Sequence, residues 1–401
     1  MKAVIIGHGL AGTMAAKTLR ELDLEVEVEL FEEENYSYYP RPNLIEFLAG
    51  RLPYEKLFAF PESWAERQRI TIHTGLKAKE LLPAEKSVVD DSGVRHRYDR
   101  LLLATGSRAN LPPIPGRDLD GVFVLRTLDD ALAILVRLKT AGKAAVIGGG
   151  LLGLEIARAL RGRGPEVTVV EFFDRLLPRQ LDGAGSALLK SHMEAAGIKV
   201  RLATATEAFT GDGGRVTGLK FKNGGSEAAD LVIVAAGVTP EVGPARQAGA
   251  GVNRGVVVDD LLRTSLPDVF AAGDCAEHRS RVYGIIPASF EQARAAAYNM
   301  LGRDLPYRGN VPATTLKVAG LAVTSAGEFD PEAGDYEVLT FQSPAEGIYK
   351  KLVLKGGRLA GAIWMGSRKG AQDITRLVSL GADVSKWKQE LFLESFDFSV
   401  V

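Results

Sequence analysis

Two stretches of the sequence share one pattern: "AVIIGHGLAGTMAAKTL" at residues 3–19 and "AVIGGGLLGLEIARAL" at residues 145–160. In each, a short apolar run ends in a glycine-rich turn, and an apolar helical pattern follows. The spacing GxGxxG is formed by Gly7, Gly9 and Gly12, and again by Gly148, Gly150 and Gly153. Strand, glycines and helix in this order are typical of a dinucleotide-binding turn, so the chain is predicted to hold two nucleotides.

Each glycine of such a turn has its own physical reason. The first permits the tight turn, the second lets a phosphate approach the backbone, and the third lets the helix pack closely on the strand. The helix N-terminus then offers free N–H groups and a partial positive charge to a pyrophosphate. The alternative is a tight strand-to-helix connection without a ligand. His8, inside the first turn, is predicted to pack within the loop rather than to catalyse.

An acidic residue follows each turn at the distance expected for binding ribose hydroxyls. A strand expected at 25–31 ends at Glu32, although Glu33 and Glu34 are alternatives. A strand expected at 166–170 ends at Glu171. A carboxylate at Glu171 would repel a 2′-phosphate, which predicts a preference for NADH over NADPH.

Two further features of the second turn leave alternatives open. Arg175 and Arg179 follow Glu171 closely and weaken the predicted preference for NADH. Glu155 stands two residues past the last glycine. It is either a first-turn acid favoured by the helix dipole or a carboxylate near the nicotinamide.

The composition fits a globular protein of two or three domains, with 401 residues of which 46% are hydrophobic and 25% charged. The formal net charge of -1 gives no support for nucleic-acid binding or a membrane-surface role. No apolar run reaches the roughly 18 residues of a membrane-spanning helix. The chain enters a strand at once, leaving no room for a signal peptide, so a cytoplasmic location is expected.

Cysteine and histidine are scarce. The single cysteine, Cys275, excludes a disulfide framework and a cysteine-based zinc or iron–sulfur site within this chain. With five histidines, a His-rich metal site is also not expected. The sequence therefore predicts no metal centre.

Three more apolar strands end in small-residue turns: "RLLLATGSRANLPPIPG" at 100–116, "DLVIVAAGVTPE" at 230–241 and "LPDVFAAGDCAE" at 266–277. Small residues permit close approach of the backbone to a ligand. In this order and together with the two glycine turns, these motifs closely resemble the pyridine-nucleotide/disulfide oxidoreductases, a family of flavoproteins that bind two dinucleotides. The resemblance covers residues 1–310.

The resemblance implies a function for each turn. The Gly7–Gly12 turn would hold FAD, and the Gly148–Gly153 turn would hold NAD(H). Thr105 and Gly106 would lie at a turn on the FAD side. Gly273 and Asp274 would lie by the FAD, with Asp274 hydrogen-bonding its ribityl chain or a nearby phosphate. Hydride would pass from the nicotinamide to the flavin.

The resemblance also implies the fold: an α/β protein with two Rossmann-like dinucleotide-binding domains and a small C-terminal α+β domain. The FAD domain would be split in sequence, over 1–110 and 238–308. The NAD(H) domain would be inserted at 111–237, and the C-terminal domain would occupy 309–401. Proline- and glycine-bearing connections near residues 111–116 and 237–244 are consistent with these borders.

The segment "NYSYYPRPNLIEFLAG" at 35–50 stands where disulfide-using relatives carry their redox cysteines, and it contains none. It instead resembles the cysteine-free branch: NADH:rubredoxin reductases, ferredoxin-reductase-type proteins and the flavin part of NADH-dependent nitrite reductases. Arg41 would then hold FAD phosphate or adenine; the alternative is a surface arginine. Ferredoxin-reductase relatives often have a lysine at the position of Glu46. Here Glu46 and Glu155 would be two facing acids, which favours the rubredoxin-reductase-like branch.

The tail adds two weaker expectations. Lys317 is a candidate to approach the flavin, with a solvated lysine as the alternative. A local set of basic residues is a candidate docking patch for a small acidic electron carrier, with a solvated face as the alternative. Its members are Lys350, Lys351, Lys355, Arg358, Arg368, Lys369 and Arg376.

The function predicted from these observations is an FAD-dependent NADH:acceptor oxidoreductase, with Glu155 and Lys317 as the candidate catalytic residues. Its electrons would pass to a small iron–sulfur protein such as rubredoxin. One alternative is the NADH-oxidising flavoprotein subunit of a larger metal-containing redox complex. Another is an NADH oxidase, which the missing cysteine disfavours.

Overall fold

The computed structural model describes residues 1–310, 313–318, 320–331 and 333–401, with the side chains of 313–317 left undescribed. The chain divides into two compact units. Unit 1 comprises Met1–Leu44, Leu52–Ala109 and Val238–Asn310. Unit 2 comprises Ile45–Arg51, Asn110–Gly237 and Val311–Val401.

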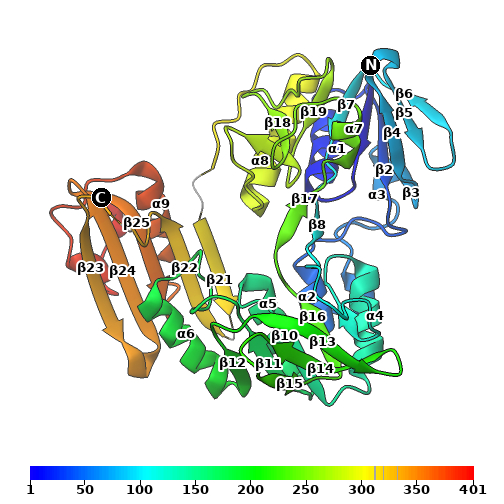
Figure 1. The fold of residues 1–401 in the computed structure, drawn as a ribbon. Coiled ribbons are helices and arrows are strands. Elements are labelled where there is room, and N and C mark those ends of the chain that lie inside the picture. Colours follow the sequence, from blue (N-terminus) through cyan, green and yellow to red (C-terminus); the bar gives the residue numbers. More distant parts are fainter. Residues whose placement is uncertain (311–312, 319, 332) are drawn as a thin grey trace. The chain divides into compact units, whose positions relative to one another are not determined.

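Unit 1 is built on a parallel sheet in the order β19-β7-β1-β2-β3. The strands are β1 (Lys2–Ile6), β2 (Glu27–Glu32), β3 (Ile70–Thr74), β7 (Arg100–Leu103) and β19 (Val269–Ala271). Their apolar runs are largely buried, as in parallel sheets that helices cover. Helices α1 (Leu10–Leu22) and α8 (Ile286–Met300) pack side by side (Figure 1).

Unit 1 also contains smaller, separate sheets. Between β3 and β7 the chain forms an antiparallel sheet of β4 (Ala78–Leu82), β5 (Ser87–Asp90) and β6 (Arg95–Arg97). Strand β8 (Ser107–Ala109) pairs with β17 (Val238–Pro240), and β18 (Val256–Val258) pairs with β20 (Ala276–His278). The short helices α3 (Trp64–Arg67) and α7 (Gly243–Gln247) belong to unit 1, whereas most of α2 (Asn43–Leu48) belongs to unit 2.

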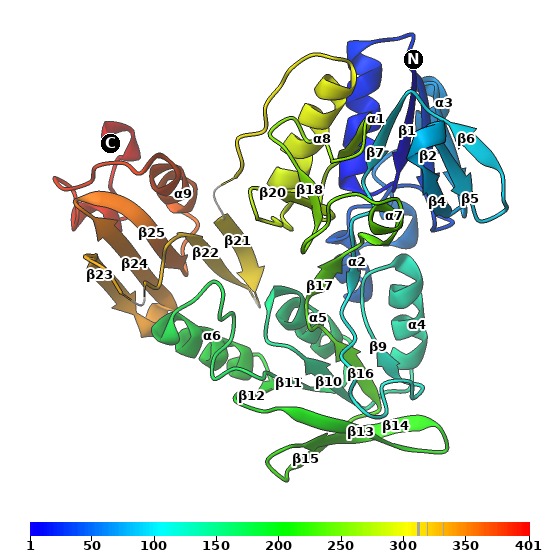
Figure 2. The same cartoon turned by 45° about the horizontal axis from the view of Figure 1, so that its top comes forward.

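Unit 2 contains a second parallel sheet, in the order β12-β11-β10-β16-β9. Its strands are β9 (Val122–Phe123), β10 (Lys143–Ile147), β11 (Glu166–Val170), β12 (Ile198–Arg201) and β16 (Leu231–Val234). Its helices are α4 (Leu128–Leu138), α5 (Leu151–Arg161) and α6 (Gly183–Ala195). A three-stranded antiparallel sheet of β13 (Thr206–Asp212), β14 (Arg215–Phe221) and β15 (Ser226–Ala228) accompanies it (Figure 2).

The remainder of unit 2 is an antiparallel sheet in the order β21-β22-β25-β24-β23, with helix α9 (Ala371–Leu380) against it. The strands are β21 (Ala313–Val318), β22 (Leu321–Gly327), β23 (Glu337–Ser343), β24 (Ile348–Lys355) and β25 (Arg358–Met365). The predicted fold class, α/β with two dinucleotide-type sheets and a C-terminal α+β portion, is confirmed.

One predicted element boundary shifts for a local reason. The strand expected from residue 25 begins at Glu27, because the Glu25 N–H donates to Asp23 Oδ1 (2.9 Å) in the preceding turn. No helix in the described ranges is long and apolar enough to cross a membrane.

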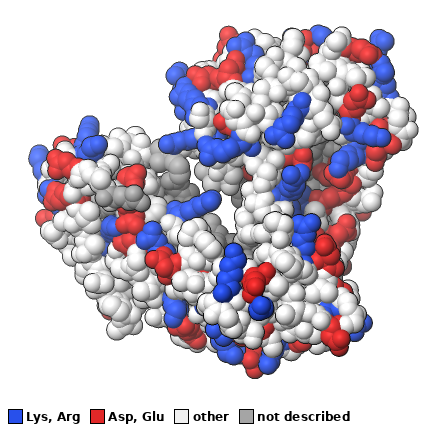
Figure 3. Space-filling view, viewed as in Figure 1, with Lys and Arg blue, Asp and Glu red and all other residues white. Residues whose placement is uncertain are grey.

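The predicted basic patch is wrong in two of its members. Lys350 is 2% exposed: its Nζ donates to the Phe392 carbonyl (3.0 Å) and lies 4.1 Å from the centroid of the Trp364 ring. Lys351 is also buried and is paired with acids. Side chains alternate along β24, so these two neighbouring lysines point to opposite faces of the sheet, and both are buried there. On the face seen in Figure 3, Lys and Arg are interspersed with Asp and Glu.

Asp182 links α6 to β24 within unit 2. Its Oδ1 accepts from the Gly185 N–H (2.9 Å), which caps the helix. Its Oδ2 accepts from Tyr349 Oη (2.5 Å) and Lys351 Nζ (2.9 Å). Burial alone would raise the pKa of the Asp182 carboxyl, but these hydrogen bonds outweigh it and hold that pKa below its ordinary value.

We expect Asp182→Asn to lower the free energy of unfolding by about 3 kcal/mol, because it leaves buried partners without their counter-charge. In the wild type this stabilisation is fully present above the pKa of the Asp182 carboxyl in the unfolded chain, about 4. It is lost as the pH falls through the lower pKa of that carboxyl in the folded protein. Urea unfolding at several pH values measures both effects. The control is Glu194→Gln on the same helix, whose exposed pair with Lys190 contributes less than about 0.5 kcal/mol. Equal effects of the two substitutions would contradict the assignment.

Candidate functional site

The two glycine turns are built alike, and their first and third glycines are required by packing. Gly7 (φ +106°) and Gly148 (φ +115°) adopt a backbone conformation that other residues rarely take. A Cβ on Gly12 would lie 1.8 Å from the Gly7 carbonyl oxygen, and one on Gly153 would lie 2.0 Å from the Gly148 oxygen. These glycines therefore let α1 and α5 begin directly against the ends of β1 and β10.

The middle glycines differ, because the space beside them is free. A Cβ on Gly9 or Gly150 would meet nothing within 4 Å among the described residues. Each is the N-cap of its helix, and in the described structure no side chain caps either helix start. An open approach to uncapped N–H groups fits the pyrophosphate of a dinucleotide.

Glu32 and Glu171 occupy matching positions in the two units. Glu32 accepts from the N–H groups of His8 and Glu34, each at 2.9 Å. Glu171 accepts from the N–H groups of Gly149 (2.5 Å) and Phe173 (2.8 Å). Each carboxylate is thus fixed to its glycine turn, and each oxygen keeps a second acceptor position for a ribose hydroxyl. Burial raises the pKa of Glu32.

Within unit 1, the predicted FAD-side turns meet. Thr105 Oγ1 donates to the Glu241 carbonyl (2.6 Å), and Ser107 Oγ donates to Asp274 Oδ2 (2.8 Å). The N–H of Gly273 donates to Gln292 Oε1 on α8 (2.8 Å). A Cβ on Gly273 would lie 2.9 Å from Ala11 on α1, so this turn packs on the same helix that the first glycine turn opens.

Arg41 is less available than the sequence indicates. Its Nη2 lies 2.6 Å from Glu34 Oε1, and its guanidinium also contacts Tyr39, whose hydroxyl donates to the same carboxylate (2.5 Å). Glu34, an alternative for the ribose acid, is therefore engaged by Arg41 instead. The remaining N–H groups of Arg41 are what it could offer to a phosphate or an adenine.

The two acids Glu46 and Glu155 do influence one another in unit 2, and Arg51 balances them. Arg51 pairs with both oxygens of Glu46, at 2.6 and 2.8 Å. Burial raises the pKa of Glu155, and the charge of Glu46 raises it further, while Arg158 and Arg51 partly oppose them. Sequence reasoning missed Arg51; its only signal was a basic residue five positions after Glu46.

Two other residues of the predicted site regions are buried. His8 is 5% exposed, and burial lowers its pKa to about 4, so the ring is neutral at pH 7. Cys275 is fully buried, with Sγ 3.3 Å from the Leu103 carbonyl oxygen, and burial raises the pKa of its thiol. A neutral buried thiol is unreactive. The side chain of Lys317 falls outside the described residues.

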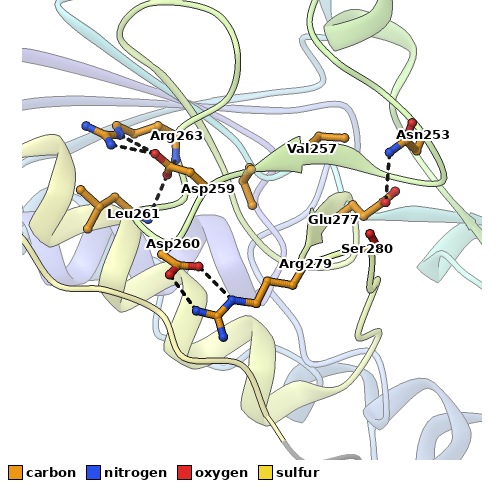
Figure 4. A pocket seen from close by; sticks show the side chains of 10 residues that line it. Asn253, Val257, Asp259, Asp260, Leu261, Arg263, Glu277, Arg279 and Ser280 are labelled. Atoms are coloured by element: carbon orange, nitrogen blue, oxygen red, sulfur yellow. Dashed lines mark hydrogen bonds and ion pairs between the residues drawn. The ribbon is translucent and has the colours of Figure 1, made fainter.

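A separate recess in unit 1 lies beside β18 and β20 (Figure 4). Its charged side chains neutralise one another: Arg263 pairs with Asp259 (2.8 Å) and Arg279 with Asp260 (2.7 Å). Its lining includes none of the predicted cofactor residues. This recess is therefore separate from the predicted dinucleotide-binding turns.

Comparison with known proteins gives the family. The model of the pyridine nucleotide-disulphide oxidoreductases matches residues 1–298, and that of the rubredoxin NAD+ reductase C-terminal domain matches residues 312–382. The chain belongs to the pyridine nucleotide-disulphide oxidoreductase family, as its motifs predicted. The prediction of FAD and NAD(H) as cofactors is confirmed at the level of the family.

Individual relatives cover nearly the whole chain. The NAD(P)H nitrite reductase of Bacillus subtilis (strain 168) is 37% identical, over 96% of this chain and 48% of that protein. The NADH-rubredoxin oxidoreductase of Clostridium acetobutylicum is 31% identical, over 96% of this chain and 93% of that protein. The solved covalent putidaredoxin reductase–putidaredoxin complex matches with a TM-score of 0.89 and 26% identity, over 99% of this chain and 97% of that one.

The lengths of these relatives differ. The chain spans about half of the nitrite reductase (48%) but nearly all of the rubredoxin oxidoreductase (93%). A sequence similar to this chain thus makes up nearly all of one relative and about half of another.

The open space beside Gly9 generates a prediction. Gly9→Ala should fold, because its Cβ meets no protein atom within 4 Å, but it should lose at least about tenfold in FAD affinity where the methyl group meets the pyrophosphate. Gly12→Ala should instead destabilise the flavin-free protein by about 3 kcal/mol, because its Cβ clashes with backbone. FAD titration and urea unfolding of both flavin-free variants measure this. Full FAD affinity in Gly9→Ala would remove that glycine from the site.

Proposed function

We propose that this chain is an FAD-dependent NADH:acceptor oxidoreductase that passes electrons to a small iron–sulfur protein such as rubredoxin. The observation that carries the proposal is the presence of two complete dinucleotide turns, each with an open middle glycine and a carboxylate fixed to the turn. When bound, FAD would supply the two-electron chemistry that links a hydride donor to a one-electron acceptor.

We assign the two nucleotides to different parts of the chain. FAD belongs to unit 1, with Gly7, Gly9, Gly12, Glu32, Thr105, Gly106, Gly273 and Asp274 as its candidate ligands and Arg41 as a further one. NAD(H) belongs to the 111–237 part of unit 2, with Gly148, Gly150, Gly153 and Glu171. The 309–401 portion is the C-terminal domain of this proposal.

The chain's own residues then have defined tasks. The backbone N–H groups at the starts of α1 and α5 orient the two pyrophosphates. Glu32 and Glu171 hold the riboses in register with those turns, because each acid is already hydrogen-bonded to its own glycine loop. Glu155, whose carboxyl is partly desolvated, is the candidate for contact near the nicotinamide. Lys317 stays a sequence-based candidate.

The absence of a usable thiol supports transfer to an external carrier. The segment 35–50 contains no cysteine, and the single Cys275 is buried with its Sγ against backbone carbonyls. Neither disulfide reduction nor cysteine-sulfenate peroxide chemistry is therefore available to this chain.

A cytoplasmic location completes the proposal, because its reductant NADH is a cytoplasmic metabolite.

A second function is favoured by one observation, the half-length match to nitrite reductase. In that case the chain would be the NADH-oxidising flavoprotein part of a larger redox assembly. Its two nucleotide sites would be unchanged, and only the acceptor would differ.

Glu171 sets the expected choice of pyridine nucleotide. Glu171→Ala removes a charged acceptor of ribose hydroxyls, worth about 1.5–3 kcal/mol, and the repulsion of a 2′-phosphate. We expect the ratio of kcat/KM for NADH to that for NADPH to fall at least about tenfold. Glu32→Ala is the matched control: it should weaken FAD retention and leave that ratio unchanged. An unchanged ratio in Glu171→Ala would exclude the residue from specificity.

The acceptor is tested anaerobically. The bound flavin is reduced with one equivalent of NADH, and its reoxidation is followed with rubredoxin and, separately, with oxygen. Fast reoxidation by rubredoxin with slow reaction toward oxygen is expected. Fast reaction of the reduced flavin with oxygen would contradict the proposed reductase and indicate an NADH oxidase. Reduction by NADH without reoxidation by either acceptor would favour the subunit of a larger assembly, which native co-purification then tests.

A further inference from the structure

Unit 1 gathers three side chains that no step of the proposed function uses. Glu29 lies on β2, His73 on the adjacent β3 and His96 on β6. One ligand atom of each lies within 4.8 Å of the others. Glu29 Oε2 is 3.7 Å from His96 Nδ1 and 3.9 Å from His73 Nε2. Figure 1 shows β2, β3 and β6 together in one part of unit 1.

The sheet register explains why these side chains converge. Phe31 pairs with His73 across the parallel strands β2 and β3, and Glu29 is two residues before Phe31, on the same face of the sheet. The Phe31 ring stacks on His73 (centroids 4.7 Å apart) and meets His96 edge-on (4.7 Å). Phe31 thereby holds both imidazoles beside Glu29.

Hydrogen bonds outside this trio decide which atoms face its centre. Asp90 Oδ2 lies 2.9 Å from His96 Nε2, so that nitrogen carries the proton and donates it to the carboxylate. The lone pair of His96 Nδ1 is then directed toward Glu29. Lys2 Nζ donates to Glu29 Oε1 (2.7 Å), which leaves Oε2 for the centre.

Two atoms that face the centre of the trio have no hydrogen-bond partner in the described ranges of the chain. Glu29 Oε2 and His73 Nε2 are buried atoms with no hydrogen-bond partner among the described residues. A carboxylate oxygen facing an imidazole lone pair is unfavourable unless a cation lies between them. The three side chains are nevertheless only 13–25% exposed, so bulk water reaches them poorly.

We propose that Glu29, His73 and His96 bind one divalent transition-metal ion of the zinc type. Two imidazole nitrogens and one carboxylate oxygen are a donor set that zinc takes in proteins, with a fourth position left for water. Ligands at about 2.0–2.1 Å in a tetrahedron stand roughly 3.3 Å apart. The observed 3.7 and 3.9 Å therefore need to close by about half an ångström, and the distance between the two imidazole nitrogens, which is at most 4.8 Å, needs to close by up to about 1.5 Å. Asp90 would orient His96 as carboxylates do behind zinc-bound histidines.

Such an ion would have a structural task. It would join the antiparallel β4–β6 sheet to the parallel sheet through β2 and β3, which belong to the same unit. Strand β2 ends at Glu32, the candidate ribose acid of the first turn. The proposal does not depend on the function proposed above, because none of its ligands is a candidate cofactor residue.

The test is metal binding to the full-length, FAD-loaded chain after chelator treatment. Zn²⁺ is titrated against a chromophoric competitor, and Co²⁺ is used to obtain a visible ligand-field spectrum. One ion per chain is expected, with affinity at least about a hundredfold weaker in His73→Gln and His96→Gln. His192→Gln, which changes a histidine of α6 in unit 2, should bind as the wild type does.

Two further variants distinguish a metal ion bound by the trio from a proton in its place. Asp90→Asn should weaken binding about 10–100-fold, because an amide donating to Nε2 places the proton on Nδ1 and blocks that ligand. Lys2→Gln should tighten binding, because it removes a positive charge 2.7 Å from Glu29 Oε1. Flavin content and circular dichroism show whether each variant folds. If another variant fails to fold, the metal affinities of His73→Gln and Lys2→Gln test the proposal.

Three results would overturn the proposal. The first is no stoichiometric binding by the wild type, which would mean that a proton on His96 closes the cluster. The second is equal binding by His73→Gln and His192→Gln, which would place the ion elsewhere. The third is a Co²⁺ spectrum of a fully hydrated ion.

Discussion

The structure depends on how closely each glycine turn approaches the backbone at the end of the neighbouring strand. At Gly7 and Gly148 a Cβ would lie 2.2 and 2.4 Å from the carbonyl oxygens of Ala104 and Ala235, the residues that follow the neighbouring strands β7 and β16. Only a glycine fits between these backbones. This contact places the first turn of α1 and of α5 over the edge of its sheet, where the middle glycine keeps the space open.

The placement of the starts of α1 and α5 also determines which charges are favoured beside the glycine turns. The uncapped helix starts favour anions, and the acids Glu32 and Glu171 are held beside them by N–H groups of the same turns. In each unit, N–H groups suited to a phosphate and a carboxylate suited to ribose hydroxyls therefore lie together. A ligand that satisfies both is a dinucleotide, in agreement with the family to which the chain belongs.

Elsewhere, charged side chains are used for packing. Lys351 and Asp182 are buried together at the junction of α6 and β24, and Arg51 neutralises Glu46 beside the partly desolvated Glu155. In unit 1 the buried Asp90 orients His96, which in turn faces Glu29. These groups have specific partners because charge taken out of water is costly unless it is paired.

The sequence by itself determined the local motifs: strand, glycine turn, helix and terminal acid, twice in one chain. Their physical cause is contained within about thirty consecutive residues, which a pattern can represent. The tertiary structure alone decided what lies side by side from distant segments. Lys350 and Lys351 were predicted to form part of a surface patch but are buried. The sequence did not predict that the charge of Arg51 acts on Glu155. The scarcity of histidine predicted no metal centre, whereas strand register brings His73 and His96 to Glu29. Spacing along a chain does not encode such convergence, because sheet order and register are set by the packing of the whole unit.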